Sequence, residues 1–129
     1  MIPKENLQAK ADSMSAYLQV KSGSEPNEII ERMENLSVMI IQAGDCLADA
    51  EYYRDSVISS ETMKVIKEGY VDKVSMTVIN NLIKALAKEE NYLVKQFDRI
   101  NSAAVHQLDG LRSILSYRKQ EFATLSYGK

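Results

Sequence analysis

The sequence has no tryptophan, one cysteine, two prolines and five glycines among its 129 residues. With so few turn-forming and aromatic residues, we expect a mostly helical chain and not a sheet. The single cysteine, Cys46, excludes an intramolecular disulfide and fits a reducing cytoplasm. No apolar run approaches the ~20 residues that a membrane span needs, and the first five residues do not resemble a signal peptide. We therefore expect a cytoplasmic protein without a membrane partner.

An excess of charge of one sign is also lacking. The 16 Lys and Arg residues nearly balance the 18 Asp and Glu residues, which gives a net charge of -2. This balance argues against wholesale coating of nucleic acid but leaves room for a local basic patch. Residues 1–74 carry 13 acidic and 8 basic side chains, whereas residues 75–129 carry 5 acidic and 8 basic ones. The basic excess therefore lies in the C-terminal part.

Apolar residues recur every three or four positions along most of the chain, which is typical of amphipathic helices. Gly23 and Gly69 interrupt this pattern, and Ser24 is suited to cap the helix that follows it. The expected elements of one domain are an N-terminal helix (1–22), a second helix (24–59), a short helix (60–69), a long C-terminal helix (75–123) and a frayed tail (124–129).

The second helix and the long C-terminal helix keep a heptad rhythm that predicts a coiled-coil-like seam. The residues assigned to the core or oligomer seam are Met33, Leu36, Ile40, Leu47, Leu86, Leu93, Phe97, Ile100, Leu108, Leu111 and Leu115. Two such helices predict an all-α antiparallel hairpin, partly covered by the N-terminal helix and the short helix. Flanking residues such as Val38, Met39, Ile41, Ile83 and Ile114 would stay exposed on a lone hairpin. We therefore predict a homo-oligomer in which hairpins share a core.

Residue sets that support catalysis or metal binding are lacking. His106 is the only histidine, and Ala103 stands where the glutamate of a di-iron Glu-x-x-His pair would be. Asp45 and Asp49 flank Cys46 and would raise the pKa of its thiol instead of activating it. The sequence also has no phosphate-binding glycine loop, no zinc-ligand spacing and no Ser-His-Asp set. We expect no catalytic residue, no metal, no cofactor and no enzymatic activity.

The second helix carries acidic residues at helical spacing. The acidic face that we assign to a protein partner consists of Asp45, Asp49, Glu51 and Asp55. Carboxylates four positions apart can bind a hard cation. Because four glutamates precede them on the same helix, a solvated acidic face is the preferred interpretation.

Residues 112–119 hold the densest basic cluster. On a helix, Arg112, Ser116 and Lys119 share one face, and Tyr117 and Arg118 project beside it. Cationic groups with hydroxyls and an aromatic ring are what a single-stranded nucleic-acid surface uses. The alternative is that Arg112 and Arg118 pair with acidic residues of the second helix or of another subunit. Oligomerisation would repeat the patch and add avidity.

The order of elements carries a family resemblance. The acidic heptad helix closes in Leu47 to Asp55, a serine-rich break and a short helix follow, and the long helix closes in His106 to Lys119. This order resembles small helical proteins that tailed phages encode beside single-strand-binding and recombination genes, in the style of T4-type recombination mediators. The resemblance implies oligomers built on the heptad residues and DNA contacts at Arg112, Arg118 and Lys119. It also implies a recombinase or single-strand-binding protein as partner, in the cytoplasm of a host cell.

Two functions follow from these observations. The first is a non-enzymatic phage-type accessory protein that self-associates and assists recombination or replication of single-stranded DNA. The alternative is a helical protein–protein interaction module without nucleic-acid binding, such as a virion or assembly component or an acidic inhibitor of a host defence protein. In the alternative, the acidic face carries the function.

Overall fold

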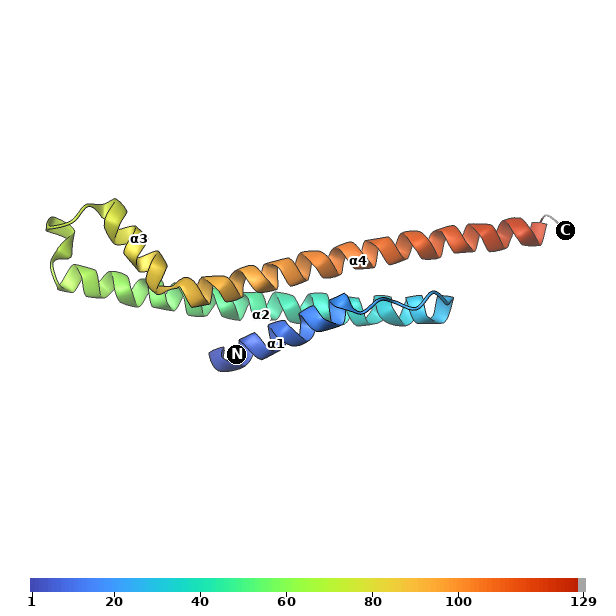
Figure 1. The fold of residues 1–129 in the computed structure, drawn as a ribbon, viewed down its shortest axis with the longest axis horizontal. Coiled ribbons are helices and arrows are strands. Elements are labelled where there is room, and N and C mark those ends of the chain that lie inside the picture. The colour runs from blue at the N-terminus through green and yellow to red at the C-terminus, as the bar shows by residue number, and fades with distance from the viewer. Residues whose placement is uncertain (128–129) are drawn as a thin grey trace.

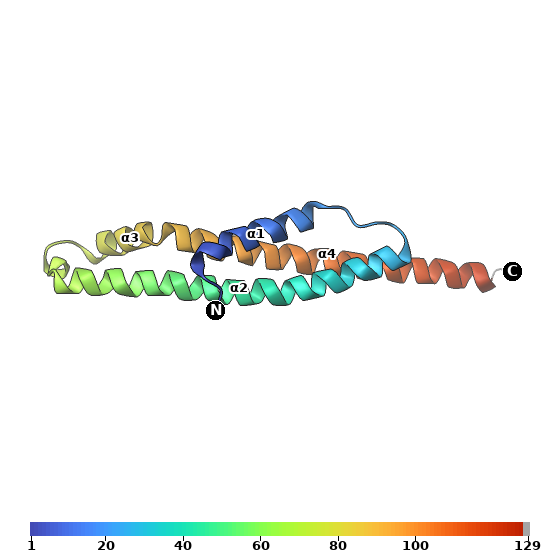
Figure 2. The ribbon, with the colours of Figure 1, turned by 90° about the horizontal axis from the view of Figure 1, so that it is seen from below.

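The computed structural model describes residues 1–127, which form an elongated helical rod (Figure 1). Its elements are α1 (Lys4–Gln19), α2 (Pro26–Lys67), the 3-10 turn η1 (Tyr70–Asp72), α3 (Met76–Leu86) and α4 (Lys88–Tyr127). The long helices α2 and α4 run antiparallel, and α1 lies beside them (Figure 2). The predicted all-α antiparallel hairpin with a short N-terminal helix is confirmed.

The core is a seam between α2 and α4 that α1 closes on one side. Phe97 is its largest fully buried side chain. Alanines at three inward positions, Ala43, Ala50 and Ala104, have no exposed surface, so the two backbones can approach closely there. The other buried members of this cluster are Leu7, Ala11, Met14, Leu36, Met39, Cys46, Leu93, Ile100 and Leu108.

The helix α1 docks along the seam and does not stand alone. With 16 residues it is too short to be stable in isolation, and it buries Leu7, Ala11 and Met14. Two hydrogen bonds fix its start to α2. The backbone N–H of Ile2 donates to the Asp49 carboxylate at 3.0 Å, and the Tyr53 hydroxyl donates to the Ile2 carbonyl at 2.7 Å.

Two predicted boundaries of the second helix are wrong. Glu25, not Ser24, is the N-cap, and α2 runs without a break to Lys67, so residues 60–69 are not a separate helix. The hydroxyl residues that predicted a stop are accommodated inside the helix. Thr62, for example, donates to the carbonyl of Ile58 at 2.7 Å. The chain leaves the helix at Gly69, whose φ of 73° is the left-handed conformation that favours glycine.

The predicted continuous helix over residues 75–123 is also wrong, because the chain breaks at Ala87 into α3 and α4. Ser75 caps α3 by accepting from the backbone N–H of Val78 at 3.3 Å. Three residues after the break, the seam holds the carboxylate of Glu90 and not an apolar side chain. Lys4 of α1 pairs with this carboxylate, while Leu86, which we assigned to the seam, is 60% exposed and lies outside the core.

The flanking residues expected to be exposed divide into two groups. Val38, Ile41 and Ile114 are exposed. Met39 and Ile83 are buried instead, because α1 covers the side of α2 that holds Met39 and α3 packs its own inner side on α2.

The end of α4 extends past the start of α2 (Figure 1). Gly110 does not interrupt it, and the helix continues to Tyr127, beyond the predicted end at residue 123. The remainder of the predicted tail, residues 128–129, lies outside the described residues. Leu111 and Leu115 are half-buried, and Phe122 further along is 74% exposed. The apolar stripe of α4 therefore extends beyond the start of α2, the helix that buries the rest of the stripe.

We predict that Phe97→Ala lowers the free energy of unfolding by about 3–5 kcal/mol, because it opens a cavity where α1, α2 and α4 meet. Urea unfolding followed by circular dichroism measures this loss. Phe122→Ala on the same helix is the matched control and should cost under about 0.5 kcal/mol at protein concentrations that favour the monomer. Equal losses in the two variants would contradict the described core.

Candidate functional site

The basic patch predicted at residues 112–119 lies on α4 beside the start of α2 and the loop before it, just ahead of the part of α4 that protrudes (Figure 1). Arg112, Ser116 and Lys119 are exposed, and Tyr117 is 63% exposed. Arg118 lies apart from them, half-buried, and its guanidinium donates to the carbonyl of Ser24 in the loop before α2. The structure thus leaves four of the five predicted contact residues exposed to solvent, while the fifth, Arg118, binds the loop before α2.

The arginines of this patch make no ion pair with α2 within residues 1–127. Arg112 pairs with Asp109 of its own helix at 3.4 Å. Both side chains are well exposed, and such a pair contributes little to stability. The charge of Arg112 therefore stays accessible to a phosphate group.

The acidic residues assigned to a partner face do not act as one set. Asp45 and Asp55 are exposed, whereas Asp49 and Glu51 are half-buried. The carboxylate of Asp49 accepts the hydrogen bond from Ile2 that anchors the N-terminus. Asp55 pairs with Arg54 at 3.1 Å. Asp49 therefore has a structural partner, which the spacing of acidic residues does not reveal.

Cys46 is buried in the seam. Burial raises the pKa of its thiol; Lys10 opposes the shift, and Asp49 and Asp45 add to it. A thiol with a raised pKa is a poor nucleophile at neutral pH. The sequence predicts this direction from the two aspartates, but burial is the larger cause.

Glu90 is a buried carboxylate whose partner sequence reasoning missed. It is 6% exposed and pairs with Lys4 at the start of α1. Burial alone would raise the pKa of Glu90. The hydrogen bond from Lys4, a bond from the Glu90 backbone and the charge of Lys4 outweigh burial, so the pKa lies below its ordinary value. No local spacing links residues 4 and 90, and only the docking of α1 shows this pair.

Arg32 is a second buried charge that sequence reasoning missed. Its side chain is 7% exposed and stacks on the ring of Tyr17, 4.0 Å from the ring centroid. One guanidinium nitrogen donates to the Tyr17 carbonyl at 3.0 Å and to the Gln107 side chain at 3.1 Å. Gln107 in turn donates to the carbonyl of Leu18 at 2.9 Å. Arg32 therefore joins α1, α2 and α4.

The sequence did contain a signal for Arg32. The buried positions of α2 are Ile29, Arg32, Leu36, Met39, Ala43, Cys46 and Ala50. They alternate spacings of three and four. Met33, Ile40 and Leu47, which we assigned to the seam, each lie one position further along and are half-buried. Counting an arginine as a seam residue would have given the observed stripe.

Within residues 1–127, no His, Cys, Asp and Glu side chains come together in a group of three that could hold a metal ion. None of the helices described is both long and apolar enough to cross a bilayer. Comparison of the chain with protein-family models, with curated proteins and with solved structures finds no match. The resemblance to phage recombination proteins therefore stays a prediction.

We predict that Glu90→Gln removes a pH-dependent part of the stability. Because the pKa of Glu90 is lowered by folding, its contribution is complete above the unfolded-state pKa of about 4.3 and is lost as the pH falls through the folded-state pKa. The difference in unfolding free energy between wild type and Glu90→Gln should shrink from pH 7 to pH 3 or below. Urea unfolding across this range measures it. Glu89→Gln, which removes one carboxylate at an exposed neighbouring position, is the matched control.

Proposed function

We propose that the protein is a non-enzymatic accessory protein that self-associates and assists the handling of single-stranded DNA in recombination or replication. The observation that carries this proposal is the open end of α4. It presents Arg112 and Lys119 on one face with Tyr117 beside them, and all three side chains are exposed. Such a helix end can lie along a flexible single strand. Its aromatic ring can stack on a base and its cationic groups can contact phosphates, and neither contact selects a base sequence.

Self-association is supported by the amount of exposed surface. The chain exposes 9088 Å², whereas a compact monomer of this mass exposes about 6,900 Å². The large apolar residues exposed along the outer side of α2 are Ile30, Val38, Ile41, Tyr52, Met63 and Ile66. Exposed apolar residues that recur along one side of a helix are typical of an interface between proteins, and a second copy is the occupant that we propose.

The mechanism combines weak contacts. One subunit offers few phosphate contacts on its α4 end, so a monomer binds a strand weakly. An assembly repeats the same basic face at fixed separations, and a strand that reaches several copies gains affinity without any new type of contact. The acidic side chains of α2 repel the strand and leave that helix to protein partners.

The alternative function is a protein–protein interaction module without nucleic-acid binding. The observation that favours it is the mixture of apolar and acidic residues on α2, where Ile41 and Tyr52 alternate with Asp45 and Asp55 in exposed positions. This composition suits a protein partner with basic and apolar groups. An oligomer that does not bind a DNA strand would support this alternative.

We predict that the wild-type protein is an oligomer by light scattering and that Ile41→Lys with Tyr52→Lys reduces its mass to that of a monomer. Placing charge in an apolar contact between copies leaves it without solvent or partner. Val20→Lys, at an exposed site in the α1–α2 connection, is the control and should keep the wild-type mass. A monomeric wild type, or a variant of unchanged mass, would refute self-association through this side of α2.

We predict that a labelled 30-nucleotide strand of thymidines binds the assembled protein and that Arg112→Gln with Lys119→Gln weakens this binding. Each phosphate group that the variant no longer neutralises should reduce the slope of log affinity against log salt by about 0.7. Fluorescence anisotropy at several salt concentrations measures both quantities. Lys64→Gln with Lys67→Gln makes the same change in charge near the end of α2 and should leave the binding unchanged.

A further inference from the structure

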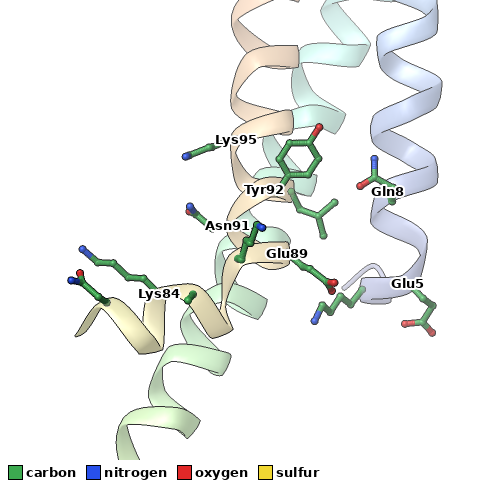
Figure 3. Close-up of a pocket in the computed structure, with 12 residues that line it drawn as sticks. Glu5, Gln8, Lys84, Glu89, Asn91, Tyr92 and Lys95 are labelled. Carbon is green, nitrogen blue, oxygen red and sulfur yellow. The ribbon is translucent and has the colours of Figure 1, made fainter. Parts of the chain in front are cut away.

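A groove of about 960 Å³ separates α1 from the junction of α3 and α4 (Figure 3). The α3 side contributes Lys84, and the first turns of α4 contribute Lys88 and Lys95. The start of α1 forms the opposite wall. These three lysines belong to two helices, and the turn at Ala87 brings them to one groove.

The lysines of the groove are accessible and lack ion-pair partners. All three are exposed, and no ion pair found within residues 1–127 includes any of them. Figure 3 shows Lys84 and Lys95 projecting to the same side, away from α1. Three cations without an ion pair attract a chain of phosphates, whereas in the patch near residue 118 Arg112 has a carboxylate neighbour and Arg118 donates to a carbonyl.

An aromatic ring lies beside this basic edge. Tyr92 is 58% exposed, and Figure 3 shows its ring on the wall of the groove between the lysine side and Gln8 of α1. A tyrosine face in this position can stack on a nucleobase while the adjoining lysines contact the backbone that carries it. The arrangement supplies, in one place, both components that bind single strands.

The acidic residues of the groove lie on its other side. Glu5 belongs to α1, and Glu89 projects toward the start of α1 and away from Lys84 and Lys95 (Figure 3). Because the basic and acidic residues lie on opposite sides of the groove, they favour one orientation of a bound strand across it. The phosphates of a bound strand would lie on the α3–α4 edge, and its bases would point inward to Tyr92.

We propose that this groove is a binding site for single-stranded DNA, with phosphates on Lys84, Lys88 and Lys95 and a base stacked on Tyr92. The inference rests on the proposed function, and it adds a contact site that the sequence patterns did not indicate. The junction of α3 and α4 lies far along the rod from the C-terminal end of α4 (Figure 1), so one subunit offers two separated contacts to a strand.

The test compares variants of the full chain for binding of a 30-nucleotide thymidine strand, at one protein concentration and with assembly checked by light scattering. The groove variant is Lys84→Gln, Lys88→Gln and Lys95→Gln. The matched control is Lys10→Gln, Lys67→Gln and Lys73→Gln, which removes the same charge from exposed sites elsewhere. We expect the groove variant to bind at least tenfold more weakly and its salt slope to fall by about 2. The control variant should bind like wild type apart from a small general effect of charge.

Tyr92 gives a test that is independent of charge. Tyr92→Ala should weaken binding about tenfold without changing the salt slope, and Tyr92→Phe should retain binding because it keeps an aromatic face. A groove variant that binds like the control variant, while Arg112→Gln with Lys119→Gln abolishes binding, would overturn the groove and leave the proposed function standing. A wild type that binds no strand at all would refute both.

Discussion

The packing of α4 on α2 is the interaction on which the rest of the structure depends. Neither helix has another partner of comparable length, and α1 is too short to be stable until the seam provides a surface for it. Phe97 and the buried alanines set how closely the two long helices approach. That separation in turn decides where α1 can lie, and therefore which polar groups meet at its two ends.

Two buried charges fix α1 in place, and they do so in different ways. At its start, Lys4 meets the carboxylate of Glu90, so opposite charges compensate each other. At its end, Arg32 has a carbonyl, an amide and an aromatic ring as partners instead of an acid. A buried cation held by neutral groups is costly to misplace, which favours a single register of α1 along the long helices.

The fold class was predictable from the sequence because the heptad rhythm of the long helices extends over many turns. The precise ends of the helices were harder to predict from the sequence. Ser59 and Ser60 have the composition of a break, but α2 continues through them, and the nearby hydroxyls of Ser56 and Thr62 bond to carbonyls of the same helix. The break at Ala87 has no local signal in the sequence, and the pairing of Lys4 with Glu90 nearby joins residues that are far apart in the chain.

The candidate sites also differ in whether local sequence could predict them. The patch at residues 112–119 could be found because its residues lie within about two helical turns of one another. The groove could not, because Lys84 and Lys95 belong to separate helices and Tyr92 becomes part of a wall only when α1 docks opposite it. The pairs Lys4–Glu90 and Arg32–Gln107 also join residues that are far apart in sequence.

The unequal ends of the rod restrict the symmetry of any assembly. One end is the α2–α3 tip, which exposes Met63, Ile66 and Leu82, and the other is the basic, solvent-open end of α4. A contact between like faces, such as the outer sides of two α2 helices, is isologous and is complete after two copies. A contact that joins the tip of one copy to the α4 end of the next is heterologous, and it closes into a ring only if each step turns by a fixed fraction of a circle. Without that turn it propagates as a filament.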